Sequence, residues 1–283
     1  MGTLLNRRRY MGGAEPNYLM TTETNPEVLA VCYAKGWCAS PDYMTYAEAA
    51  AVTSIGTNTA SAFYQNTSIT HFEEFQYFGV TTLGQRNFYG CTNLTKIVLP
   101  SSVVTIPGMC FYNCENLESL GYSSITSIES NAFYNCKKLE YFTFSNLLTY
   151  IGGSAFNGCS VINFTNDIPS SVTTLGTSTF ANIGFTGHLT IPSNITSIPQ
   201  RLCQNSKVTS VTLPSTCTEI GLYAFYGCNQ MQSLTILATT PPSLGTSPFQ
   251  NMTGTIYVPA ASVSAYQAAW SNQASRIQAI PTT

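Results

Sequence analysis

The chain has 283 residues, of which 44% are hydrophobic, 12% aromatic and only 8% charged, with a formal net charge of −2. Serine, threonine and asparagine supply 88 of the residues, and the apolar content is too high for a disordered chain. Eleven basic residues against thirteen acidic ones exclude a basic face that follows nucleic-acid phosphates, and no apolar stretch approaches the ~18 residues of a membrane-spanning helix.

Residues 1–20 are predicted to form an N-terminal arm, marked by the consecutive basic residues Arg7, Arg8 and Arg9. Residues 11–16 after them cannot serve as the apolar segment of a secretory signal peptide, so no such signal is predicted. The arm has two interpretations. It is either a solvated tail, or a docking segment whose arginines bind acidic or carbonyl groups of a partner chain.

Residues 21–53 are predicted to form a helical N-terminal cap. Residues 25–27 read Asn-Pro-Glu, which places an N-cap, a proline at the first helical position and an acid in the first turn, and Gly36 ends this helix. Thr45 and Glu48 have the spacing of a capping box and begin a second helix. Because the end of a stack of repeats exposes apolar residues, we expect this helical pair to cover the first repeat.

A repeat of roughly 23 residues runs through residues 54–258 and is marked by Phe-Tyr-x-Cys or a variant of it. An isoleucine or leucine lies five residues before most of the phenylalanines, and a short β-type segment lies between them. Each unit is therefore predicted to contain a strand, a turn, a second short strand and a helical or 3₁₀ turn that carries the phenylalanine. One unit cannot bury its apolar residues alone, so about nine units stack into a β-rich solenoid. The positions aligned with the phenylalanine are Phe63, Phe88, Phe111, Phe133, Phe156, Phe180, Leu202, Phe225 and Phe249.

Cysteines share one position of the repeat, three residues after the phenylalanine. They are Cys91, Cys114, Cys136, Cys159 and Cys228. The other units have Asn66, Ile183, Asn205 and Met252 there. Because isoleucine and methionine replace cysteine, the position is predicted to be small, buried and apolar, with reduced thiols. No close pair of cysteines recurs from unit to unit, so neither a disulfide framework nor a metal site is predicted.

Residues 259–283 are predicted to form a C-terminal cap that follows a last strand beginning at Thr255. Residues 262–270 have the pattern of a short helix with its apolar residues on one face. Residues 276–280 have the pattern of a closing strand. This cap would cover the apolar residues of the last unit.

Residues 54–280 resemble the BspA-like bacterial leucine-rich repeats, whose units read L-x-x-I-x-L-P…V-x-x-I-G-x-x-A-F-x-x-C. The match is most specific at residues 94–114 and 208–228. The resemblance implies a curved right-handed solenoid, a binding or adhesion role at a microbial surface, and no catalytic residues. Leu202 and the irregular segments 122–124 and 163–170 depart from the pattern, which puts the regularity of the strands there in question.

The chain offers little chemistry for catalysis. Its two histidines, His71 and His188, lie several units apart, on the order of 20 Å at about 4.8 Å per strand step, so they cannot share a site. The adjacent acids Glu73 and Glu74 would point to opposite faces of a strand. No enzyme activity, cofactor or metal site is therefore predicted.

The remaining candidate for function is the row of outward-facing residues on the first strand of each unit. This row is either a solvated sheet face or a concave recognition surface. It is nearly uncharged and rich in hydroxyl groups, which suits a glycan or an uncharged protein patch better than an anion. The candidate binding residues are His71, Glu73, Lys96, Tyr141, Thr143, Asn163, His188, Ser210, Thr212 and Tyr257.

The sequence therefore predicts a non-enzymatic recognition or adhesion solenoid that binds a protein or glycan partner at a microbial or virion surface. The alternative is a structural component of a large assembly, such as a phage head fibre, decoration or tail protein, anchored by the N-terminal arm. Neither interpretation involves nucleic acid, a membrane span or a cofactor. The ligand and the oligomeric state are not predicted.

Overall fold

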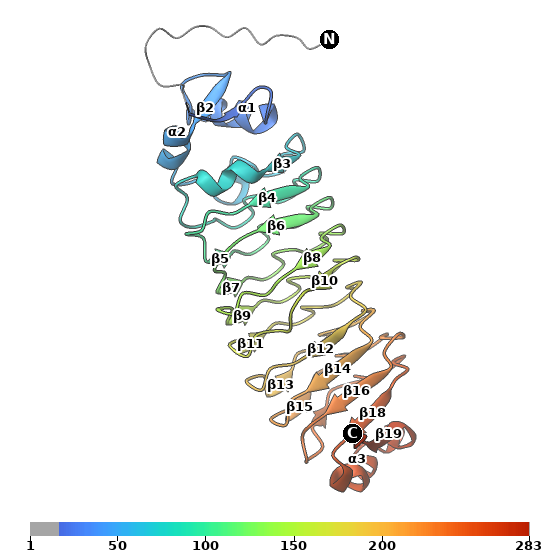
Figure 1. Ribbon diagram of the computed structural model, residues 1–283. Helices are drawn as coiled ribbons and strands as arrows, with labels where there is room; N and C mark the ends of the chain where they lie inside the picture. Colours follow the sequence, from blue (N-terminus) through green and yellow to red (C-terminus); the bar gives the residue numbers. More distant parts are fainter. Residues whose placement is uncertain (1–16, 283) are drawn as a thin grey trace.

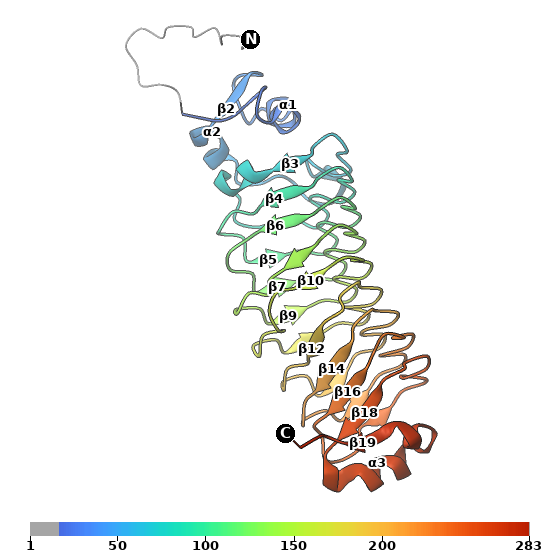
Figure 2. The same ribbon diagram turned by 45° about the vertical axis from the view of Figure 1, so that its right-hand side comes forward.

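The computed structural model describes residues 17–282. They form one elongated stack of repeated units with a helical segment at each end (Figure 1), and a second view shows the same succession of strands along the long axis (Figure 2). This arrangement confirms the predicted β-rich solenoid. The arginines Arg7, Arg8 and Arg9 of the predicted arm lie outside the described residues. No helix within residues 17–282 is long and apolar enough to cross a membrane.

The N-terminal segment combines two helices with a two-stranded sheet that the sequence did not predict. Strand β1 (Tyr18–Thr21) pairs antiparallel with β2 (Tyr43–Thr45). Helices α1 (Pro26–Ala34) and α2 (Tyr46–Ala51) begin where the sequence predicts them. The capping box is present, because the Thr45 hydroxyl accepts from the Glu48 N–H and the Glu48 carboxylate accepts from the Thr45 N–H.

Asn25 is the N-cap residue of α1 by position, but its side chain makes no cap hydrogen bond. Its Nδ2 instead donates to His71 O at 3.1 Å and to Glu74 Oε2 at 2.9 Å. Asn25 is fully buried. The expected local cap is thus replaced by a contact between the N-terminal segment and the first unit of the stack.

The first strands of the units form three parallel sheets along one side of the stack (Figure 1). Most of these strands bury the residue between their outward-facing ones, as Ile97 and Val211 show. The sheets are interrupted between β6 and β8 and between β10 and β12, next to the two irregular segments of the sequence. The strands are β3 (His71–Phe72), β4 (Lys96–Val98), β6 (Ser119–Gly121), β8 (Tyr141–Phe142), β10 (Asn163–Phe164), β12 (His188–Thr190), β14 (Ser210–Leu213), β16 (Ser233–Ile236), β18 (Thr255–Val258) and β19 (Ile277–Ala279).

The second strands form two further parallel sheets, interrupted between β11 and β13. In each of these strands the second residue is an isoleucine or leucine that faces the core, which explains the isoleucine and leucine column of the sequence. The strands are β5 (Thr105–Ile106), β7 (Ser127–Ile128), β9 (Tyr150–Ile151), β11 (Thr174–Leu175), β13 (Ser197–Ile198), β15 (Glu219–Ile220) and β17 (Ser243–Leu244).

The turn that carries the phenylalanine is neither helical nor 3₁₀, contrary to the prediction. The residues two before and two after Phe133, which are Asn131 and Asn135, have φ values of 59° and 56°, in the left-handed region that asparagine tolerates better than most residues. Most other units have positive φ at the same two places. The turn brings the rings into a stack, with the centroid of Phe133 5.5 Å from that of Phe111.

The unit near residue 202 is aligned one residue differently from the prediction, which placed Leu202 at the phenylalanine position. In neighbouring units the phenylalanine N–H donates to the carbonyl just before the next phenylalanine, as Phe133 does to Ala155 O at 2.8 Å. Phe180 N–H donates to Leu202 O at 2.9 Å. The residue aligned with phenylalanine is therefore Cys203.

This shift exchanges a large and a small residue between two buried positions. Leu202 lies where other units have a small residue such as Ala132, and Cys203 lies where they have phenylalanine. Both side chains are fully buried. Ser206, which is buried, takes the cysteine position that the sequence assigned to the exposed Asn205.

The cysteine position is occupied by free, buried thiols that act as hydrogen-bond donors. Each thiol donates to the carbonyl of the phenylalanine position in the preceding unit, as Cys91 Sγ does to Phe63 O at 3.0 Å. Cys114 and Cys136 make the same contact at 3.0 and 3.1 Å. Cysteine suits this position because it is small and still supplies a weak donor.

The C-terminal segment closes the stack with helix α3 (Val263–Ala269), flanked by the 3₁₀ turns η3 (Ala260–Ser262) and η4 (Ser271–Arg276), and with strand β19. This agrees with the predicted helix and closing strand. Strand β19 pairs parallel with β18 and forms the edge of its sheet. Gln267 Nε2 of α3 lies 3.4 Å from Ile277 O on that edge strand.

Candidate recognition face

Two rows of outward-facing side chains follow the first strands, and we call them together the strand face. The first row is His71, Lys96, Ser119, Tyr141, Asn163, His188, Ser210, Ser233 and Thr255. The second row, two residues later, is Glu73, Val98, Gly121, Thr143, Thr165, Thr190, Thr212, Thr235 and Tyr257. All ten predicted binding residues lie in these rows, and the interruptions of the sheets divide them into three groups.

The first group contains the ion pair of the strand face. The Lys96 ammonium pairs with the Glu73 carboxylate, and His71 Nδ1 lies 3.1 Å from Thr70 Oγ1. Glu73 is not a strand residue, contrary to the prediction, because the 3₁₀ turn η2 (Glu73–Tyr77) begins there. Its side chain nevertheless reaches the neighbouring strand.

The second group surrounds the most exposed large hydrophobic side chain of the described residues, Tyr141, which is 59% exposed. A hydrogen bond with the Glu140 carboxylate and its negative charge raise the pKa of the Tyr141 hydroxyl. Beside it, Thr143 Oγ1 lies 2.6 Å from Thr165 Oγ1. Asn163 lies in the first row next to Tyr141.

A groove of ≈ 440 Å³ adjoins this second group. Its lining residues are Glu118, Lys138, Glu140, Val161 and Asn163. Another ion pair lies in the first two of the three units that line this groove, between Lys137 Nζ and Glu115 Oε1 at 2.9 Å. In a chain with 8% charged residues, this concentration of charge around one exposed tyrosine distinguishes the middle of the strand face. The sequence did not predict this cluster of charged residues, because they precede the strands and do not lie in them.

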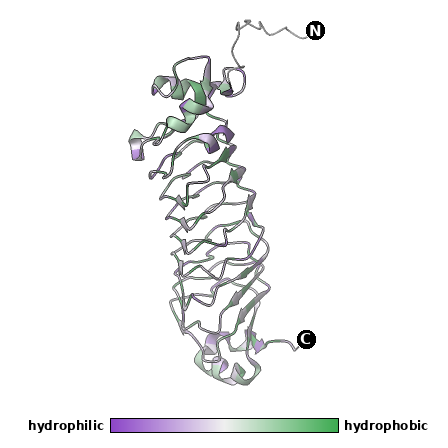
Figure 3. Ribbon diagram, turned by 60° about the vertical axis from the view of Figure 1, so that its left-hand side comes forward, coloured by the Kyte–Doolittle hydropathy of each residue, from purple (hydrophilic) through white to green (hydrophobic). Residues whose placement is uncertain are grey.

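The third group belongs to the five-stranded sheet at the C-terminal end and carries no charged side chain in either row between His188 and Tyr257. His188 Nδ1 lies 2.7 Å from Ser210 Oγ. Thr190, Thr212 and Thr235 lie opposite one another in register. Colouring by hydropathy shows hydrophobic and hydrophilic residues alternating along the units (Figure 3).

The two histidines lie in different sheets, β3 in one and β12 in another, so the structure does not bring them into one site. Within the described residues, no group of three or more histidine, cysteine, aspartate or glutamate side chains could hold a metal ion. Burial raises the pKa of the thiols of Cys114, Cys136, Cys159 and Cys228, that of Cys228 to about 11. Such protonated thiols are poor nucleophiles.

Comparisons with known proteins agree with this architecture. A model of the BspA type leucine rich repeat region matches residues 53–186 and 165–274, with six copies. No curated protein matches the chain.

Several solved structures are similar to this chain. A leucine-rich repeat protein from Bacteroides ovatus is 23% identical over 64% of this chain and 59% of that chain, with a TM-score of 0.42. A leucine-rich repeat protein of T. pallidum is 19% identical over 68% of this chain and 67% of that chain, with a TM-score of 0.36. A leucine rich cell surface protein from Faecalibacterium prausnitzii is 20% identical over 73% of this chain and 76% of that chain, with a TM-score of 0.34. The match spans 59% of the length of the Bacteroides protein.

Proposed function

The chain belongs to the BspA-type leucine-rich repeat family, and from this premise we propose that it is a non-enzymatic recognition protein that binds a protein partner through the strand face at a microbial surface. Repeat solenoids commonly use such an extended face for binding. The observation that carries the proposal is the exposed Tyr141 with its charged surroundings in the middle of this face.

The region around Tyr141 has the composition of a protein-binding hot spot. Tyrosine is enriched among the residues that dominate binding energies, because a rigid ring buries a large area and its hydroxyl finds a partner. Val161, also on this groove, is 46% exposed and adds apolar area. Glu118, Lys138 and Glu140 surround the two, as the polar rim of an interface does.

The side chains of the strand face are ordered in the absence of a partner. The parallel strands align neighbouring rows, with Tyr141 opposite Asn163, and hydrogen bonds such as that between Thr143 and Thr165 fix side chains within the second row. Groups that are already ordered lose little conformational entropy on binding. This order favours recognition by a rigid surface.

The experiment compares two tyrosines on different sheets. Tyr141→Ser removes the ring from the strand face, whereas Tyr150→Ser removes an outward-facing ring from β9 on the second sheet. Cross-linking on intact microbial cells, followed by mass spectrometry, identifies partners of the unmodified protein. We expect a partner that Tyr150→Ser retains and Tyr141→Ser loses. Equal retention by both variants, or the absence of any cross-linked protein, would contradict the proposal.

A second function is favoured by Arg7, Arg8 and Arg9, which are three of the eleven basic residues of the chain. An arm with this charge suits docking onto acidic or carbonyl groups, and the protein would then be a structural component of a virion or another large assembly. Fractionation of the native source distinguishes the two functions. Recovery with purified particles supports the structural role, and recovery with the cell surface supports the recognition role.

A further inference from the structure

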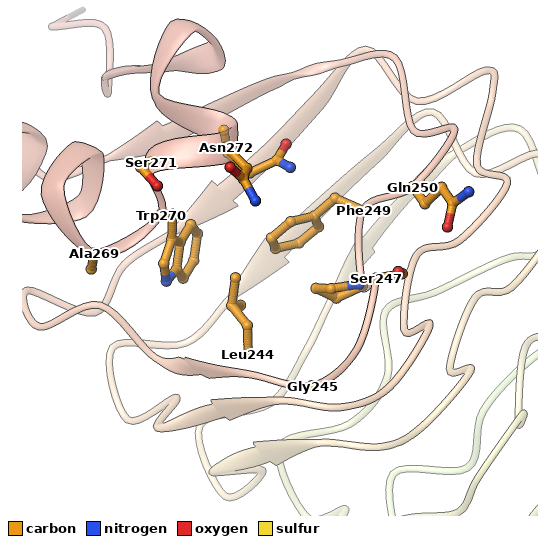
Figure 4. Close-up of a pocket in the computed structure, with 11 residues that line it drawn as sticks. Leu244, Gly245, Ser247, Phe249, Gln250, Ala269, Trp270, Ser271 and Asn272 are labelled. Carbon is orange, nitrogen blue, oxygen red and sulfur yellow. The ribbon is translucent and has the colours of Figure 1, made fainter.

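A groove of ≈ 450 Å³ lies where the last repeat unit meets the C-terminal segment (Figure 4). One side comes from β17 and the turn after it, and the other from the end of α3 and the start of η4. None of its lining residues belongs to the strand face.

The floor of the groove is aromatic and fixed in place. The Trp270 and Phe249 rings lie side by side with their centroids 5.5 Å apart (Figure 4). The Trp270 indole N–H donates to Pro242 O at 3.2 Å, and Tyr266, one turn earlier, donates to Ala238 O at 2.7 Å. The indole thus uses its polar group within the protein. Only 5% of Trp270 and 3% of Phe249 is exposed, so the two rings lie beneath the groove and support its base.

The rest of the lining combines apolar residues such as Leu244 and Ala269 with amides and hydroxyls, and it carries no charged side chain. Gln250 and Ser247 approach from the repeat side, and Ser271, Asn272 and Gln273 from the other side. Amides and hydroxyls supply both donors and acceptors. The groove can therefore satisfy groups of either kind without neutralising a charge.

Arg276 determines how Gln273 is oriented. Its Nη1 donates to Gln273 Oε1 at 3.1 Å, and its Nε and Nη2 both donate to Gly254 O. A guanidinium has only donors, so the amide oxygen of Gln273 faces Arg276 and the amide NH₂ group remains to donate elsewhere. The guanidinium itself is not part of the lining, which leaves the groove without a cation for an anionic ligand.

We propose that this groove binds a short neutral saccharide. Sugar hydroxyls both donate and accept hydrogen bonds, as the amides and hydroxyls on the two sides do. The half-buried Leu244 and the exposed Ala269 of the lining suit the C–H face of a sugar ring. An anionic or cationic ligand would find no opposite charge among the lining residues. The volume lies towards the small end of the roughly 300–1,000 Å³ of ligand pockets, which restricts the ligand to one or two sugar rings.

Tryptophan fluorescence provides a direct assay, because Trp37 and Trp270 are the only two tryptophans of the chain. Trp37→Phe leaves Trp270 as the sole reporter. The probes are glucose, galactose, mannose, N-acetylglucosamine, lactose and cellobiose, with glucuronic acid, glucosamine and triglycine for comparison. We expect at least one neutral sugar to change the Trp270 emission saturably, and the charged sugars and the peptide to bind at least about tenfold more weakly. The proposal is wrong if no neutral sugar saturates the signal, or if a charged sugar or the peptide binds as well.

Variants locate the binding to the groove. Gln250→Ala and Asn272→Ala each remove one exposed amide from opposite sides, and each should weaken binding about fivefold, the effect of one lost hydrogen bond. The matched controls Asn229→Ala and Gln230→Ala remove exposed amides outside the groove and should leave binding unchanged. Unaltered binding by the groove variants, or equal losses in the controls, would show that the sugar binds elsewhere. The result is independent of the strand face, so failure here leaves the proposed protein recognition untouched.

Discussion

Restoring the usual residue pair at positions 202 and 203 tests the alignment of the irregular unit. Leu202→Ala alone leaves a cavity at a fully buried position and should cost about 2–5 kcal/mol. Cys203→Phe alone adds a ring beside an unchanged leucine, and such overpacking costs about 1–3 kcal/mol. The double variant recreates the Ala-Phe pair of residues 132–133, 155–156 and 224–225. Its new ring would lie between the stacks that contain Phe180 and Phe225.

The two effects should compensate, because the cavity of one variant accommodates part of the bulk of the other. We expect the double variant to be more stable than Leu202→Ala, with a coupling energy of about 2–3 kcal/mol, at the upper end of the range for residues in contact. Urea unfolding of all four proteins under reducing conditions, followed by circular dichroism, gives the midpoints and slopes. If the two losses simply add, Cys203 does not occupy the phenylalanine position and the reasoning fails.

Four other predictions concern the core, the thiols and the arm. Phe133→Ala removes a buried ring stacked on Phe111 and Phe156 and should lower the free energy of unfolding by about 3–5 kcal/mol, measured in urea. The control Tyr134→Ala, which truncates the half-buried neighbour, should lower it far less. A loss below about 1 kcal/mol for Phe133→Ala would show that the ring stack is not core. Thiol titration after unfolding without reductant should count nearly all ten cysteines as free, and several disulfides would overturn the thiol row. Burial raises the pKa of Cys32 to about 12 and that of Cys217 to about 11 from the ordinary 9.0, so the folded state favours the protonated thiols. Their contribution to the free energy of unfolding is complete below pH 9.0 and should fall as the pH rises to 11–12. The urea midpoint should therefore decline over that pH range. Deleting residues 1–13 should leave the Tm of the isolated protein unchanged but abolish its incorporation into an assembly; unfolding, or assembly at normal levels, would exclude a docking arm.

The repeat made most of the architecture predictable, because a ladder of identical positions is visible in a single sequence. The exception at Leu202 shows the limit of that approach. Spacings of both 22 and 23 residues occur between units, so an unusual Leu-Cys pair fits either alignment. The structure separates the two through the backbone hydrogen bond from Phe180 to Leu202 and through the positive φ of Arg201 and Asn205, two residues before and after Cys203.

Local patterns placed helix ends correctly but could not assign the contacts of their side chains. Residues 25–27 predicted the start of α1, yet Asn25 bonds to His71, which lies 46 residues further along the chain. The 3₁₀ turn at Glu73 brings Phe75 and Phe78 into a buried cluster with Phe72. The spacing of three residues between these phenylalanines is a signal that alternation alone overlooked.

The candidate sites were predictable to different degrees. The rows of the strand face follow from alternation within each strand, so their membership could be predicted residue by residue. The groove at Trp270 could not, because Phe249 and Asn272 come from separate segments that meet only when the C-terminal helix packs on the last unit. Its sequence signal was limited to a run of exposed polar residues after that helix.

The side-chain amides of Asn25 and Gln267, at the two ends of the stack, bear on whether further strands can add to it. A stack of parallel strands can be extended at either end, because each edge strand has free backbone carbonyls and N–H groups with which a further strand could pair. Asn25 occupies the outer carbonyl of His71 at one edge, and Gln267 lies against that of Ile277 at the other. Growth into a filament is thereby opposed at both edges by a single polar side chain presented from a helical segment. The two terminal segments thus act as stops for strand addition as well as covers for the apolar ends of the stack.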